Sequence, residues 1–298
     1  MYGELDRFLV PLHEPEARRY FTQSLYVPQG PAGRLRRATG RPQLKRASST
    51  QGIEHVLSML DEVPDLITNE SAIYLRDYET SERGRTIAFF HPAMVVKTQR
   101  AGAAPSLRVE SEAIEQMGAF LPPDLKKTLP AVLRYHTSPR GELLAMTALP
   151  GRSAYIDMQG SLAPWKYVEE HFDAAAKWLA AFHLATRTSD TSIVKGKEIP
   201  HSAMHGDFWP RNVLLSDDGA VGVVDWEHFT HSASPLTDVL HYATTYGINY
   251  PWRRYQRVDE KEALRRTFRE KNRVSRAVRA YFETYSKLTG ITVAMPAA

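Results

Sequence analysis

The sequence has no cysteine among its 298 residues. A disulfide framework, a cysteine-ligated zinc site and a thiol nucleophile are therefore excluded. Long apolar runs are also missing, and no stretch approaches the length of a membrane-spanning helix. The first twenty residues contain Glu4 and Asp6 and lack an apolar core, so no signal peptide is expected. We expect a cytoplasmic protein with no membrane span.

The positive charge is modest and unevenly distributed. The net charge is +4, and 43% hydrophobic residues are enough for a substantial core. One basic segment, residues 34–46, has no acid between its cations, and a second basic region covers residues 253–279. Such clusters serve nucleic-acid, membrane-surface or anionic-substrate contacts, but most are solvated faces. We expect no nucleic-acid partner, while peripheral membrane contact and the oligomeric state stay open.

The most informative stretch runs from His205 to Glu227. Two short apolar runs, residues 213–215 and 221–224, flank the turn-forming sequence Ser-Asp-Asp-Gly at residues 216–219. The pattern predicts a loop, a strand, a tight turn and a second strand that ends at Asp225. Such a hairpin can gather Asp207, Asn212 and Asp225 into one cluster. Carboxylate and amide oxygens without cysteine suit a hard cation such as Mg2+.

The motif H-G-D-x-x-x-x-N, from His205 to Asn212, followed by D-W-E at residues 225–227, resembles the aminoglycoside phosphotransferase and choline kinase group. That group is the small-molecule branch of the protein-kinase-like fold. Protein kinases carry H-R-D-x-x-x-x-N and D-F-G instead, so Gly206 and the D-W-E sequence favour the small-molecule branch. The resemblance implies an α+β, bilobal protein-kinase-like fold with an antiparallel-sheet N-lobe and a mainly helical C-lobe.

We expect three regions along the chain. Residues 1–70 are an N-terminal extension of unknown role, which the resemblance does not cover. Residues 71–149 form a nucleotide-binding N-lobe, with strands at 72–75, 86–90 and 94–97 and a hairpin from 131–136 and 142–147. Residues 150–298 form a catalytic and substrate-binding C-lobe, which includes a long amphipathic helix from Val168 to Phe182. The loop at 77–84 has one glycine, so a phosphate-binding loop is only weakly indicated.

Helical spacing singles out one carboxylate in the N-lobe. Leu107, Glu110, Ile114 and Met117 share a helix face, which places Glu110 within an apolar stripe. An unpaired charge there is costly, and Lys97 at a strand end is a suitable partner. By resemblance, Glu110 holds Lys97 and Lys97 contacts the α- and β-phosphates of ATP.

A sequence like the hinge between kinase lobes occurs at residues 148–151, Ala-Leu-Pro-Gly. By resemblance, the chain near Met146 and Leu149 binds adenine, largely through backbone groups. Met146 faces either the adenine pocket or the core, since methionine suits both.

The resemblance implies ATP-dependent transfer of the γ-phosphoryl group to a hydroxyl of a small molecule. In this scheme Asp207 orients the hydroxyl and takes its proton, while Asn212 and Asp225 hold Mg2+. His205 supports the loop, and Asp238 pins it by hydrogen bonds. We expect a sugar, an amino alcohol or a related metabolite as the acceptor, and the basic region favours a neutral or anionic one, such as a sugar, a phosphorylated intermediate or a lipid-linked glycan. A polycationic aminoglycoside is less expected, because few acids follow the motif and the region from Arg253 is basic.

Alternative hypotheses remain. A pseudokinase would bind nucleotide without transferring phosphate. A zinc hydrolase would use His201, His205, His228 and His231, whose spacings allow ligation on a helix. His183, beside the apolar face of its helix, is expected to be a core histidine. The aromatic segment 242–257 is a hypothetical lining of the substrate pocket.

Overall fold

A computed structural model of the chain describes most of its residues. The chain divides into two compact units, Met1–Ala119 with Pro130–Pro150, and Phe120–Leu129 with Gly151–Ala298. The two units are described separately below. The described residues are 2–5, 8–11, 13–26, 44–46, 53–66, 72–76, 84–90, 92, 94–160, 163–194, 196–252 and 256–295.

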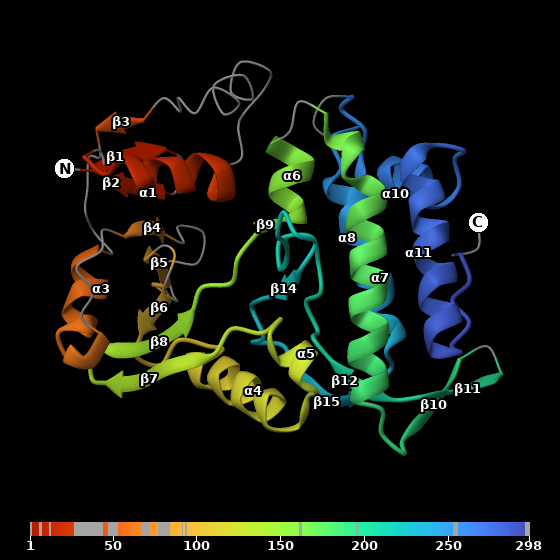
Figure 1. The fold of residues 1–298 in the computed structure, drawn as a ribbon, viewed down its shortest axis with the longest axis horizontal. Helices are drawn as coiled ribbons and strands as arrows, with labels where there is room; N and C mark the ends of the chain where they lie inside the picture. Colours follow the sequence, from red (N-terminus) through yellow and green to blue (C-terminus); the bar gives the residue numbers. More distant parts are fainter. Residues whose placement is uncertain are drawn as a thin grey trace. The chain divides into compact units, whose positions relative to one another are not determined.

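The first unit is built on an eight-stranded antiparallel sheet, with the strand order β3-β1-β2-β4-β5-β6-β8-β7 (Figure 1). The strands are β1 (Tyr2–Leu5), β2 (Phe8–Pro11), β3 (Lys45–Arg46), β4 (Ile73–Arg76), β5 (Thr86–Phe90), β6 (Met94–Arg100), β7 (Val132–Ser138) and β8 (Gly141–Thr147). The strands expected between residues 72 and 147 are confirmed. The boundaries expected for the three regions stay predictions, although strands β1 to β3 join the first seventy residues to this sheet.

Helix α3 (Ile53–Leu60) packs on this sheet because its apolar residues recur at helical spacing. Ile53, Val56 and Met59 are buried in one cluster with Val96 of β6 and Ala145 of β8. Helices α1 (Pro15–Tyr20), η1 (Phe21–Leu25), η2 (Pro64–Leu66) and α4 (Leu107–Phe120) complete the unit. Helix α4 follows β6 directly, and that order places Glu110 near Lys97.

The second unit is mainly helical. Its helices are α5 (Pro123–Lys126), α6 (Ala154–Gly160), η3 (Pro164–Lys166), α7 (Val168–Ala185), α8 (Leu236–Asn249), α10 (Glu260–Phe268) and α11 (Arg273–Thr289). Helices α7 and α11 lie side by side, and α8 packs against α10 (Figure 1). Helix α7 confirms the helix expected from Val168 to Phe182. Aromatic rings fill the space between these helices, namely Phe172, Tyr242, Tyr246 and Tyr281.

Short strands position the motif residues of the second unit. The hairpin expected between Val213 and Val224 is confirmed as β13 (Val213–Leu215) and β14 (Val221–Val223), paired from Val213 opposite Val223. Strand β9 (Arg152–Ser153) pairs with β13 on its other side. Strand β12 (Ser202–Met204) leads into His205 and pairs with β15 (Thr230–Ala233). A separate hairpin is formed by β10 (Thr191–Val194) and β11 (Lys197–Pro200).

The α+β class, with an antiparallel sheet in one unit and helices in the other, agrees with the expected kinase-like fold. Within the described ranges, no helix is both long enough and apolar enough to cross a membrane. The basic segment 34–46 and the loop 77–84 lie almost entirely outside the described residues, so the expectations for them stay predictions.

Candidate active site

The loop that follows β12 is held by one buried carboxylate. Asp238 on α8 is 0% exposed, and its two oxygens accept hydrogen bonds from the backbone nitrogens of His205 at 2.7 Å and Gly206 at 3.0 Å. Burial raises the pKa of Asp238, but the imidazole rings of His183, whose Nε2 lies 3.8 Å from Oδ2, and of His205 outweigh it and lower the pKa overall. The carboxylate therefore stays charged and anchors the loop, as the resemblance implies.

His205 joins the loop to the strand that precedes Asp225. The ring is fully buried, and its Nε2 donates to the carbonyl of Val224 at 3.1 Å. Its Nδ1 accepts from the backbone nitrogen of Asp207 at 3.2 Å. This pair of contacts needs one protonated and one unprotonated nitrogen, so the ring is neutral. Burial lowers the pKa of His205, and the expected supporting role agrees with this geometry.

Gly206 explains why this motif has glycine where protein kinases have arginine. Its φ is +84°, and a Cβ there would lie 2.3 Å from the backbone oxygen of His228. A side chain would be strained by the left-handed backbone and by the close carbonyl. The tight approach lets the loop turn directly into Asp207.

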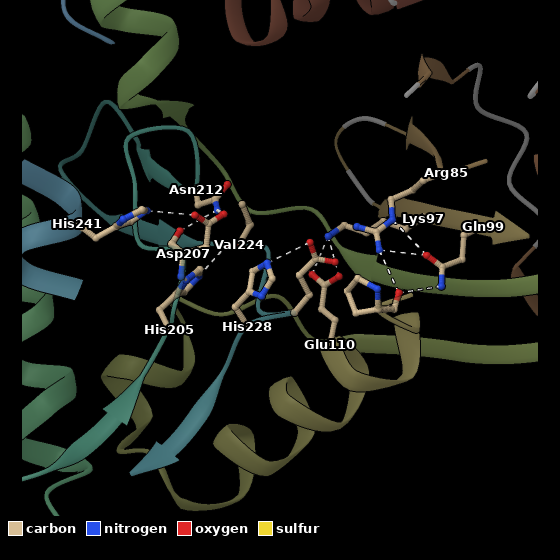
Figure 2. A network of polar contacts seen from close by, with 12 residues as sticks. Arg85, Lys97, Gln99, Glu110, His205, Asp207, Asn212, Val224, His228 and His241 are labelled. Atoms are coloured by element: carbon tan, nitrogen blue, oxygen red, sulfur yellow. Dashed lines mark hydrogen bonds and ion pairs between the residues drawn. The ribbon is translucent and has the colours of Figure 1, made fainter. Parts of the chain in front are cut away.

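Asp207 lies between two hydrogen-bond donors (Figure 2). Asn212 Nδ2 donates to Asp207 Oδ2 at 3.1 Å and also to the Asp207 carbonyl at 3.0 Å. His241 Nε2 lies 3.2 Å from Asp207 Oδ1. The side chain of Asp207 is 33% exposed, so solvent reaches this carboxylate. The structure thus joins Asp207 and Asn212 as predicted and adds His241, which the motifs do not indicate.

Asp225 follows β14 with a φ of +70°, a left-handed conformation that is uncommon for a residue other than glycine. The backbone nitrogen of Val224 donates to the Asn212 carbonyl at 3.0 Å, and this bond joins the segments that carry Asn212 and Asp225. The strained backbone marks a functional position, since such strain clusters at active sites.

The side chains of Asn212 and Asp225 fit Mg2+ by their chemistry. Asn212 Nδ2 is engaged by Asp207, so Oδ1 is its acceptor atom for a cation. Mg2+ in kinases is held by one or two carboxylates together with substrate phosphates rather than by an all-protein cage. Within the described part of the chain, no group of three or more histidine or acidic side chains is arranged to hold a metal.

In the first unit, the expected ion pair between Lys97 and Glu110 is present (Figure 2). Lys97 Nζ lies 2.7 Å from both carboxylate oxygens of Glu110, and the side chains are 7% and 0% exposed. Two short contacts compensate for the cost of removing both charges from water. The buried carboxylate predicted from helical spacing therefore has the partner that spacing required.

Glu142 on β8 fixes the start of α4 and so the place of Glu110. Its carboxylate accepts from the backbone nitrogen of Leu107 at 2.7 Å, from Ser106 Oγ at 2.6 Å and from Gln99 Nε2 at 2.8 Å. A carboxylate at a helix N-terminus is also favoured by the helix dipole. The sequence shows Glu142 as an ordinary strand residue, and only the pairing of β6 with β8 shows its role.

Residues 159–281 match the model of the phosphotransferase enzyme family, known as APH. The matched segment covers less than half of the chain. It contains Asp207, Asn212, Asp225 and Asp238. The resemblance inferred from the motifs is confirmed, and the match supports an ATP-dependent small-molecule kinase. A search of curated proteins found no match.

Two solved structures have a fold similar to that of this chain. An aminoglycoside-3'-phosphotransferase of type VIII has a TM-score of 0.54 and 15% identity, covering 80% of this chain and 94% of that one. An aminoglycoside phosphotransferase from Streptomyces rimosus has a TM-score of 0.50 and 14% identity, covering 80% of this chain and 98% of that one. Identities this low establish the kinase-like fold alone.

The residues that we expect to bind adenine lie in the first unit. Met146 is buried on β8 opposite Val95 of β6, and Leu149 is half-buried just after the strand. Their roles at an adenine pocket stay predictions.

The structure also bears on the aromatic segment 242–257 and on the remaining histidines. Tyr242 and Tyr246 are fully buried among the rings of α7 and α11, and a substrate-lining role for the rest of the segment stays a prediction. The four histidines proposed as zinc ligands form no metal-binding group within the ranges that the structure describes. His183 is a core histidine, 2% exposed, whose Nδ1 lies 2.8 Å from the Tyr285 hydroxyl.

Proposed function

We propose that this chain transfers the γ-phosphoryl group of ATP to a hydroxyl of a small molecule that is not a polycation. The observation that carries the proposal is the position of the Asp207 carboxylate. It is accessible to solvent and bound by Asn212, and the buried Asp238 anchors the backbone of its loop. Such a carboxylate is positioned to act on an incoming hydroxyl.

The proposed reaction is a single displacement. The acceptor oxygen forms a bond to the γ-phosphorus, and the bond from that phosphorus to the oxygen shared with the β-phosphate breaks, which releases ADP. The acceptor proton passes to Asp207. Because phosphoryl transfer needs little covalent chemistry from the protein, catalysis consists of positioning and charge neutralisation.

Lys97 is proposed to bind the α- and β-phosphates, with Glu110 holding its ammonium group. Asn212 and Asp225 would hold Mg2+, which when bound neutralises charge on the phosphate oxygens. The chain near Met146 and Leu149 is proposed to bind adenine.

The charges of the second unit argue against a polycationic acceptor. Asp238 is buried and bound to the loop, so it does not attract a polycation. Three arginines of the basic region are paired with glutamates: Arg265 and Arg266 with Glu262, and Arg273 with Glu169. We therefore propose a sugar or an amino alcohol ahead of an aminoglycoside, which is the class named for the solved structures of similar fold.

The test is phosphate transfer from labelled ATP with Mg2+, with wild type and Asp207→Ala side by side. The acceptor panel contains sugars, amino alcohols, aminoglycosides and a crude bacterial metabolite extract. We expect label on one acceptor class in wild type, and a loss of turnover of about 100- to 10,000-fold in Asp207→Ala.

Near-normal turnover in Asp207→Ala would exclude the proposed role of this residue. Efficient phosphorylation of kanamycin-like compounds would contradict the proposed acceptor class. ATP binding without transfer to any acceptor would support the pseudokinase instead.

A further inference from the structure

The starting observation is the side chain of His241 beside Asp207. His241 lies on α8, three positions after Asp238, and residues spaced by three share a helix face. Asp238 binds the backbone at His205 and Gly206. The same face of α8 therefore carries His241 to the next residue of the loop, where Nε2 lies 3.2 Å from Asp207 Oδ1.

The chemistry of this contact assigns the donor. An ionised carboxylate only accepts hydrogen bonds, so Nε2 of His241 carries the hydrogen. Asn212 donates to the other oxygen, Oδ2, at 3.1 Å. One donor on each oxygen fixes the rotation of the carboxylate plane. Each oxygen still has a second lone pair for an acceptor hydroxyl.

The exposure of His241 separates it from the structural histidines of the unit. Its side chain is 37% exposed, whereas His183 and His205 are buried within hydrogen-bonded networks. If the half-exposed ring of His241 is removed, water can form hydrogen bonds with Asp207, and no buried cavity is left. We therefore expect the fold to tolerate loss of the His241 ring. Among the described residues, its side chain forms a hydrogen bond with the carboxylate of Asp207.

We propose that His241 is a positioning residue for phosphoryl transfer, which orients Asp207 by donating from Nε2 to Oδ1. This inference rests on the proposed function, because Asp207 is the group through which His241 acts. Asn212, within the loop, donates to one carboxylate oxygen of Asp207, and His241, on α8, donates to the other (Figure 2).

The test compares His241→Ala and His241→Gln with wild type, using the acceptor found for the wild-type protein. We expect kcat to fall about 10- to 100-fold in His241→Ala, the effect of losing a hydrogen bond to a charged group. KM for ATP and the melting temperature should stay within error. His241→Gln should recover most of kcat, because the glutamine amide can donate to Asp207.

Two controls make the outcome specific. Leu240→Ala changes the adjacent exposed residue of α8 and should leave kcat unchanged. In the Asp207→Ala background, His241→Ala should cause no further loss, since two residues that act as a unit are not additive.

Each other result overturns the proposal. Wild-type kcat in His241→Ala would show that the contact does not serve the reaction. Equal loss in the alanine and glutamine variants, with a lowered melting temperature, would show a structural role. An inactive wild type would overturn the proposed function and this inference together, whereas an active wild type with an active His241→Ala would overturn this inference alone.

Discussion

The ion pair of Lys97 with Glu110 and the contact of Asp207 with His241 differ in how they are built. In the first unit Lys97 and Glu110 form a pair with side chains 7% and 0% exposed. In the second unit Asp207 and His241 are 33% and 37% exposed. A dry pair of opposite charges keeps its geometry because neither charge can separate cheaply. An open carboxylate with one donor on each oxygen can exchange a contact for a substrate. Rigidity and accessibility are thus divided between the two units.

The largest expected effect tests the dry centre. Lys97→Ala leaves the Glu110 carboxylate buried without its partner, so the free energy of unfolding should fall by about 3–5 kcal/mol. Urea denaturation measures this change. The matched comparison is Asp207→Asn, which should cost far less stability because water reaches the site. Equal losses in the two variants would contradict the division between a dry and an open centre.

A double variant sharpens the same test. Lys97→Met with Glu110→Leu removes both charges and fills the space with apolar atoms, which is often neutral for stability. We expect it to be more stable than Lys97→Ala in the same denaturation experiment, although it should not bind ATP normally. A double variant less stable than Lys97→Ala would show that the ion pair itself stabilises the unit.

The next effect is the pH dependence of stability that we expect from the buried His205, which lies two residues before Asp207. Burial lowers the pKa of His205 from 6.5 in the folded protein. Below about pH 6.5, His205 is protonated in the unfolded chain but stays neutral in the folded chain. Protonation therefore favours the unfolded state, and the free energy of unfolding decreases as pH falls. The slope reaches at most about 1.4 kcal/mol per pH unit for one proton.

Urea denaturation of wild type and His205→Gln at pH 7.5, 6.5 and 5.5 measures this effect. The glutamine amide can donate to Val224 but does not titrate. The stability advantage of wild type over the variant should therefore shrink as pH falls. A constant difference across this range would mean that His205 is not the group responsible.

The smallest effect is expected at a third type of pair, fully at the surface. Arg265 Nε lies 2.6 Å from a carboxylate oxygen of Glu262. Hydrogen bonds from Arg265 and Arg266 lower the pKa of Glu262 to about 2. Exposed pairs contribute little to stability. Arg265→Gln should change neither the melting temperature nor KM for the acceptor. A raised KM would restore this arginine as part of an anionic acceptor site.

Much of the site is predictable because it is local in sequence. Asp207 and Asn212 lie in one short loop, and a hairpin of fixed register returns the chain to Asp225. Glu110 is predictable for another reason, because a carboxylate within an apolar helical stripe requires a cation. The fold class follows from the same elements, whose apolar spacing distinguishes the strands from the long helices.

The rest depends on contacts between distant segments. Glu142 binds the start of α4 only because β8 pairs with β6, and no local pattern shows this. His241 is separated from Asp207 by the hairpin and β15, although its spacing from Asp238 was an available signal. An aromatic run predicts core and pocket equally well, so the sequence does not show that Tyr242 and Tyr246 are core residues. Their burial follows from the packing of α7 and α11.

Helix α8 also changes what counts as a transferable part of this protein. It supplies Asp238, which holds the loop backbone, and His241, which contacts the loop's carboxylate. A chimera that imports only residues 205–227 into another scaffold leaves both supports behind. The smallest exchangeable module is therefore residues 205–249, hairpin and helix together, and its sequence should be recombined or redesigned as one block.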